Sequence, residues 1–172
     1  ILNVKEIKLR GTHNFENICA ALAATRELVD EKTAVEAIKE FNAVEHRLEF
    51  VREINGVKWY NDSASSSPSR TIAGLNAYDE EIVLIAGGYD KNLDYDILGK
   101  YIVRKVKALV LIGNTAKKIL DATTKELEKQ GVELPICFCQ TLGDAVKAAK
   151  QVAKENQVVL FSPASASFDM FK

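Results

Sequence analysis

The chain has 172 residues and a nearly balanced charge, with 23 Lys and Arg residues against 24 Asp and Glu residues, for a net charge of −1. This is about the length of one domain, and 47% hydrophobic and 8% aromatic residues are ordinary for a globular protein. The balanced charge provides no sequence-wide basic field for nucleic acid and no cationic face for an anionic membrane. This composition argues against a disordered or fibrous protein. No apolar run approaches the ~18 residues of a membrane helix, which argues against a membrane-spanning protein.

The three cysteines, Cys19, Cys137 and Cys139, cannot all pair, which favours a reducing compartment. Cys137 and Cys139 share a face of a predicted strand but lack the CxxC spacing of zinc and redox sites, so we expect core thiols. The two histidines have no matched third ligand, and we expect no metal site in this chain. The chain does not begin with Met or with a signal peptide, and we expect it to start inside a longer protein.

Two helices are predicted first. Apolar residues recur at helical spacing through an Ala-rich stretch from His13 to about Val29. A shorter helix follows, with Thr33 as its predicted N-cap and Glu36 completing a capping box three residues later. The pattern changes at about Asn42, where we expect a domain boundary.

A β-hairpin comes next. Leu48 to Ile54 alternates apolar and charged residues, and the pattern resumes at Val57 to Tyr60. Asn55 and Gly56 between these runs are a strong hairpin signal, because both residues tolerate the positive φ angles of a type I′ turn.

The rest of the chain alternates between strands and helices. Apolar runs that are not interrupted by polar residues are typical of parallel strands covered by helices on both faces. We therefore predict an α/β fold with a Rossmann-like, mostly parallel sheet that opens with the hairpin. The predicted strands are 82–86, 108–112, 136–139 and 158–161, and the predicted helices are 68–77, 94–104, 114–130 and 141–155.

Small, hydroxylated and Gly-rich segments follow the predicted strands, at 61–68, 87–91, 113–115 and 162–167. In an open α/β sheet these segments meet at the carboxyl ends of the strands, where ligands bind. Helix N-termini and Lys91 would favour a carboxylate or a phosphate there. Each segment alone also fits a solvated loop, a helix cap or a tight turn. The chain contains neither a G-x-x-x-x-G-K-[ST] phosphate loop nor a G-x-G-x-x-G fingerprint.

Five segments together resemble the Mur ligase family. G-T-H-N-F-E-N at 11–17, before the Ala-rich helix, resembles its G-x-H-N-x-x-N motif, and E-H-R-L-E at 45–49 resembles the H-R-x-E segment that opens its C-terminal domain. N-D-S at 61–63, G-G-Y-D-K at 87–91 and S-P-A-S-A-S-F-D-M-F at 162–171 resemble the members that add D-glutamate. The resemblance covers essentially the whole chain.

The resemblance implies that residues 1–42 are the last helices of a central ATPase domain. Residues 43–172 would then be most of the amino-acid-binding C-terminal domain, truncated at its end. The implied activity is ATP-dependent addition of D-glutamate to UDP-N-acetylmuramoyl-L-alanine, through an acyl phosphate, in peptidoglycan synthesis. The full-length enzyme would use ATP and Mg²⁺, but the phosphate loop and the main magnesium ligands of the family lie outside this chain. We therefore expect these 172 residues alone to be inactive.

The resemblance also implies site residues for the nucleotide. Asn14 and Asn17 would contact it through their amides, and Arg47 would reach the ATP phosphates. Asp62 would hold the ribose hydroxyls, although it could instead satisfy the Ser-rich loop around it.

For D-glutamate, the resemblance implies Lys91 and Ser167 as carboxylate-binding residues, with Ser66 as a further hydroxyl. Many family members carry lysine where this chain has Ala64, so one positive charge is missing there.

The resemblance further implies a bacterial cytoplasmic protein that is monomeric at full length and acts on small molecules, with no nucleic acid or membrane as partner. Two alternatives remain open. One is a related Mur or folylpolyglutamate-type ligase for another amino acid, and the other is a non-catalytic α/β binding module.

Overall fold

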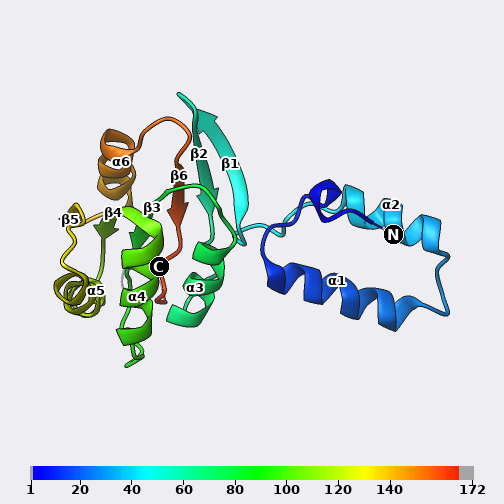
Figure 1. Cartoon of the computed structure of the whole chain (residues 1–172), viewed down its shortest axis with the longest axis horizontal. Coiled ribbons are helices and arrows are strands. Elements are labelled where there is room, and N and C mark those ends of the chain that lie inside the picture. The colour runs from blue at the N-terminus through cyan, green and yellow to red at the C-terminus, as the bar shows by residue number, and fades with distance from the viewer. Residues whose placement is uncertain (1, 167–172) are drawn as a thin grey trace.

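A computed structural model describes residues 2–166 of the protein. The helices and strands follow the predicted order (Figure 1). They are the 3-10 helix η1 (Val4–Glu6), α1 (Thr12–Thr25), α2 (Glu31–Glu40), β1 (Glu49–Ile54), β2 (Val57–Asn61), α3 (Pro68–Asn76), β3 (Ile82–Ala86), α4 (Asp96–Lys105), β4 (Val106–Leu111), α5 (Ala116–Gln130), β5 (Ile136–Phe138), α6 (Leu142–Val152) and β6 (Val158–Phe161).

The strands form one sheet in the order β1-β2-β6-β3-β4-β5. β1 pairs antiparallel with β2, and every other pair is parallel, so the predicted mostly parallel sheet opened by a hairpin is confirmed. The hairpin turn has φ angles of 51° at Asn55 and 72° at Gly56, as a type I′ turn requires. The chain returns through α6 to place β6 between β2 and β3, which brings the last strand to the middle of the sheet.

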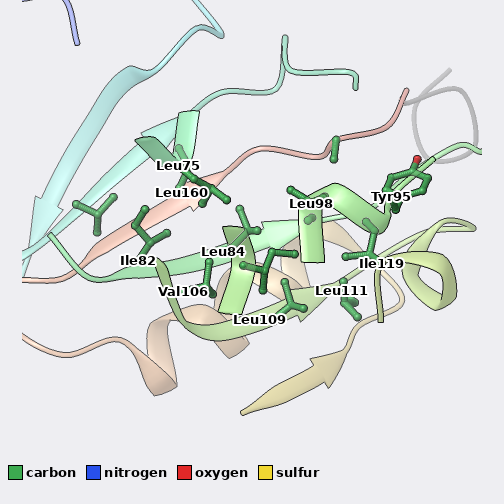
Figure 2. Close-up of a cluster of buried hydrophobic side chains, with 14 of the residues drawn as sticks. Leu75, Ile82, Leu84, Tyr95, Leu98, Val106, Leu109, Leu111, Ile119 and Leu160 are labelled. Atoms are coloured by element: carbon green, nitrogen blue, oxygen red, sulfur yellow. The ribbon is translucent and has the colours of Figure 1, made fainter. Parts of the chain in front are cut away.

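Helices cover both faces of the sheet, as predicted. On one face, apolar side chains of α3, α4 and α5 pack against alternate strand residues such as Leu84 and Leu109, and Figure 2 shows this cluster. On the other face, Ala145 and Ala149 of α6 pack against the intervening residues, among them Ile85. All five residues of β3 are buried, which explains why its sequence does not alternate.

Cys137 and Cys139 pack against the α6-side cluster but are only partly buried, so the expectation of core thiols is confirmed only in part. Among residues 2–166, no helix is both long enough and apolar enough to cross a membrane.

Figure 1 shows α1 and α2 extending away from the sheet as a pair. We call residues 2–42 the helical unit and residues 43–166 the α/β unit. Neither α1 nor α2 contains a buried residue, and Leu28 between them is 81% exposed. The apolar spacing that predicted these helices therefore has no core to face within the described part of the chain.

The predicted start of the second helix is wrong. The N-cap of α2 is Asp30, whose carboxylate accepts hydrogen bonds from the backbone N–H (3.1 Å) and the hydroxyl (2.7 Å) of Thr33. Thr33 is thus the donor in the first turn rather than the cap, because a carboxylate accepts both bonds at once. These two bonds lower the pKa of Asp30.

Candidate functional site

The carboxyl ends of the parallel strands bring the predicted loop segments to one edge of the sheet. Asp62 directly follows β2, Ser162 follows β6, Gly87 follows β3, and Thr115 lies four residues after β4. Two hydrogen-bond networks of buried side chains join these loops.

The first network is built on Asp62, which is 3% exposed. Its carboxylate accepts a hydrogen bond from the Ser162 hydroxyl (2.7 Å) and one from the backbone N–H of Leu48 (3.3 Å). The Ser162 hydroxyl also bonds to the Thr71 hydroxyl (2.9 Å) of α3. Burial raises the pKa of Asp62, and hydrogen bonds from Ser65 and Ser162 oppose that rise. Both carboxylate oxygens thus have protein partners, as the alternative that Asp62 satisfies the loops around it requires.

The second network is centred on the Ser165 hydroxyl. It bonds to the Thr115 hydroxyl at 2.7 Å and to the Tyr95 hydroxyl at 2.8 Å, and all three residues are buried. The Thr115 hydroxyl in turn accepts the backbone N–H of Gly88 at 3.0 Å. This network therefore fixes the loops after β3, β4 and β6 against one another.

The loops that carry the predicted D-glutamate residues lie close together. The backbone N–H of Tyr89 donates to the carbonyl of Ala166 (2.7 Å), two residues before Lys91 and one before Ser167. A Cβ on Gly88 would lie 2.3 Å from that same carbonyl oxygen, so only glycine permits this approach. Lys91 is exposed, and Ser167 lies outside the described residues.

Ser66, the third predicted D-glutamate residue, is half-buried in the loop after β2. Its backbone N–H donates to the carbonyl of Ala64 at 3.0 Å. Ser66 therefore lies at the same strand-end edge as Lys91, but on a different loop.

A cavity of about 770 Å³ extends from between α1 and α2 to the α/β unit, and both units line it. Its walls are largely apolar, with Ile18, Leu22 and Phe41 from the helical unit. All four predicted nucleotide residues line it, Asn14 and Asn17 from α1 and Arg47 and Asp62 from the α/β unit. Residues that are up to 48 positions apart in sequence are thus brought to one cavity, to which both units contribute.

Sequence reasoning missed Arg70, which also lines this cavity. It lies in the first turn of α3, and its guanidinium donates to the carbonyl of Ala64 at 3.2 Å. Arg70 thus places a positive charge beside the position where the resemblance led us to expect a lysine. Its place just after Ser67 and Pro68, at the start of a helix facing the strand ends, is the signal that could have found it.

A second cavity of about 790 Å³ lies on the α6 side of the sheet. Trp59, Phe161, Leu142 and Val146 form apolar walls, and Gly88 lies among its lining residues. None of the predicted site residues in the described chain lines it.

No group of three or more His, Cys, Asp or Glu side chains within residues 2–166 is arranged to hold a metal ion.

Comparison with known proteins decides the family. The model of the Mur ligase, glutamate ligase domain, matches residues 46–165. The chain belongs to the Mur ligase family. It is 52% identical to a UDP-N-acetylmuramoylalanine--D-glutamate ligase of Acetivibrio thermocellus and 45% identical to one of Clostridium tetani, with all of this chain covered in both cases. This Mur ligase chain spans 37% and 38% of those relatives' lengths.

Solved structures show the same fold at low sequence identity. MurF from Acinetobacter baumannii matches 92% of this chain and 36% of its own with a TM-score of 0.69 at 18% identity. A folylpolyglutamate synthase of Mycobacterium tuberculosis complexed with ADP matches 92% of this chain and 39% of its own, with a TM-score of 0.69 at 16% identity. At these identities the likeness establishes the α/β fold of this Mur ligase domain and nothing more.

Proposed function

We propose that the chain is the carboxyl-terminal part of an ATP-dependent ligase that joins D-glutamate to UDP-N-acetylmuramoyl-L-alanine in bacterial peptidoglycan synthesis. The observation that carries the proposal is the convergence of Asn14, Asn17 and Arg47 on one cavity between two units. Relatives at 45–52% identity that are named UDP-N-acetylmuramoylalanine--D-glutamate ligases support the choice of D-glutamate. We further propose a cytoplasmic enzyme that is monomeric at full length.

The proposed reaction has two steps, phosphorylation of a carboxylate and formation of an amide. A carboxylate oxygen of the muramoyl-alanine attacks the γ-phosphorus of ATP, an acyl phosphate forms, and ADP leaves. The amine of D-glutamate then attacks the acyl carbon, and the tetrahedral intermediate collapses. The amide forms, phosphate leaves with the C–O bond electrons, and the amine loses a proton. Catalysis of such steps rests mainly on positioning and on neutralising charge.

On this proposal the cavity between the units holds the nucleotide. The amides of Asn14 and Asn17 offer both donors and acceptors to it, and Arg47 offers a planar, always-charged guanidinium to phosphate oxygens. Arg70 adds a second guanidinium to the same cavity. Asp62 forms part of the wall and supports these residues through its bonds to Leu48 and Ser162.

Lys91, Ser66 and Ser167 are the proposed D-glutamate residues. The proximity of the loops after β3 and β6, through Tyr89 and Ala166, supports the pairing of Lys91 with Ser167. A lysine ammonium suits the side-chain or α-carboxylate of the amino acid as a point charge.

The proposal is tested on the longer protein that contains this chain. ATP hydrolysis and ligation are measured with UDP-N-acetylmuramoyl-L-alanine and a panel of amino acids. D-Glutamate should support both. Ligation of another amino acid in its place would establish the alternative ligase, and no ligation of any amino acid would favour the non-catalytic binding module. The 172 residues alone should hydrolyse no ATP.

Residue roles are separated by their effects on KM. Arg47→Ala should raise the KM for ATP about tenfold, which is the effect of losing about 1.4 kcal/mol of binding. Lys91→Ala should raise the KM for D-glutamate far more than that for ATP. Arg52→Ala, which removes an exposed arginine outside the nucleotide cavity, is the control and should change neither. Equal effects of Lys91→Ala on both KM values would remove Lys91 from the D-glutamate site.

A further inference from the structure

Arg10, just before α1, reaches across from the helical unit to the α/β unit. Its guanidinium carbon lies 5.2 Å from the ring centroid of Tyr60 and 5.1 Å from that of Tyr78. Its Nη1 lies 3.6 Å from Oε2 of Glu80. A guanidinium within about 6 Å of an aromatic face is attracted by the ring quadrupole, and here two rings and a carboxylate surround one cation.

The partners of Arg10 are held firmly by the α/β unit. Tyr78 is 1% exposed, and the rings of Tyr60 and Tyr78 stack edge to face with centroids 4.9 Å apart. Phe50 of β1 extends this row, with its centroid 5.5 Å from that of Tyr60. The contact surface for Arg10 is therefore built from packed aromatic rings of the hairpin and of the turn after α3.

The backbone of Arg10 is tied to the nucleotide cavity. The side-chain amide of Asn14 donates to the carbonyl of Arg10 at 2.6 Å. Between them lies Gly11, with φ +91°, where an added Cβ would sit 3.4 Å from Cβ of Ala77 at the end of α3. The guanidinium contact and the position of Asn14 are thus two ends of one short, closely packed segment.

The chain passes from the helical unit to the α/β unit once, between residues 42 and 43, in the segment that joins α2 to β1. A single connector allows rotation, so it does not by itself fix how α1 faces Arg47. Arg10 provides a second attachment point, in the segment that leads into α1. A second attachment point removes most of the rotational freedom that a single connector leaves between two rigid bodies.

We propose that Arg10 is a positioning residue that latches the helical unit onto the α/β unit and so assembles the cavity between them. The part of this inference that concerns ligand binding rests on the proposed nucleotide site. The latch itself, formed by Arg10, Tyr60, Tyr78 and Glu80, is independent of which ligand the cavity takes.

The test measures the distance between the units in this chain. Spin labels are attached to Cys19, which is exposed on α1, and to a Lys125→Cys variant on α5, with Cys137→Ala and Cys139→Ala removing the other thiols. Double electron–electron resonance gives the distribution of distances between the two spin labels. Isothermal titration calorimetry measures the binding of ADP to the same proteins.

Arg10→Ala should at least double the width of the distance distribution and raise the dissociation constant for ADP about threefold, because a smaller fraction of molecules has the assembled cavity. Arg10→Lys, which keeps the charge but loses the planar stacking, should lie between Arg10→Ala and the parent. Two controls should match the parent. Lys58→Ala removes a lysine of the α/β unit whose Nζ lies 3.8 Å from Oε1 of Glu80, so it removes a charge near Glu80 without removing a link between the units. Arg26→Ala removes an exposed arginine of the helical unit.

An unchanged distance distribution in Arg10→Ala, with circular dichroism showing a folded protein, would overturn the latch. A broad distribution already present in the parent would overturn it too. If Arg10→Ala broadens the distribution but no variant binds ADP, the latch stands and nucleotide binding by this chain is refuted. A loss of folded structure in Arg10→Ala leaves the decision to Arg10→Lys, whose width must exceed that of the parent.

Discussion

Removing the Asp62 carboxylate should destabilise the fold, whereas replacing it by an amide should not. In Asp62→Ala the buried N–H of Leu48 loses its acceptor, and the Ser162 hydroxyl keeps only its bond to Thr71. An unsatisfied buried donor costs about 1–3 kcal/mol, so we expect a loss of about 2 kcal/mol in the free energy of unfolding. For a chain of this size that loss lowers Tm by about 6 °C.

Asp62→Asn keeps an acceptor for the Leu48 N–H and removes a buried charge. The Ser162 hydroxyl can rotate to accept from the new amide, since it has Thr71 as a second partner. We therefore expect the free energy of unfolding of Asp62→Asn at pH 7 to lie within about 0.5 kcal/mol of the wild-type value. Urea unfolding followed by circular dichroism measures both variants against the wild type.

The wild type and Asp62→Asn should also differ in pH dependence. Burial raises the pKa of Asp62 in the folded state, so the folded protein binds this proton more tightly than the unfolded chain. The stability gained from that proton is fully present below the ordinary Asp pKa and is lost as the pH rises through the raised one. The wild type should therefore gain stability relative to Asp62→Asn as the pH falls from 7 toward about 4.

Equal stability of Asp62→Ala and the wild type would refute the network argument. The same pair of variants decides between the two roles of Asp62. If its carboxylate held a ribose, Asp62→Asn would weaken nucleotide binding in the longer protein while leaving stability unchanged. If it is part of the wall, nucleotide affinity should follow the stability of each variant.

Three further predictions concern stability. Gly87→Ala should lower the free energy of unfolding, measured in urea, by about 3 kcal/mol or more, because φ is +113° and the new Cβ would lie 1.9 Å from the carbonyl oxygen of Ile112. The control Gly131→Ala, with φ +64° and open space around it, should lower it by only about 1 kcal/mol, and equal losses would contradict the steric argument. Ser165→Ala should cost about 1–3 kcal/mol by leaving the buried Tyr95 hydroxyl without this partner, and a neutral result would show that the network is not needed for stability. In hydrogen exchange, the amides of α1 should open at least about tenfold more readily than those of β3, because α1 buries no residue and β3 is fully buried; equal protection would contradict this difference.

The sequence predicted most of the fold because its local signals agree with one another. Uninterrupted apolar runs, a hairpin turn at Asn55 and Gly56 and a proline at the first position of α3 each predict an element that the structure contains. The start of α2 was mispredicted at Thr33 because Asp30 and Thr33 are both good N-caps, and sequence alone does not say which side chain accepts.

The candidate site was predicted by motif more than by pattern. Asn14, Asn17 and Arg47 were found through family resemblance, and the structure places them around one cavity. Arg70 was missed because an arginine in the first turn of a helix is common on protein surfaces, and only its tertiary position reveals that it faces this cavity. The role of Asp62 was left open for the same reason.

By itself, the sequence of 172 residues with balanced charge determined a globular α/β chain and its order of helices and strands, because hydrophobic periodicity and turn chemistry act over short stretches of chain. It also indicated two units that meet near Asn42. Only the tertiary structure decided how those units face each other. Arg10 meets Tyr60, Tyr78 and Glu80 across at least 50 residues of sequence, and such contacts depend on the return of β6 and the packing of α3 rather than on any local pattern.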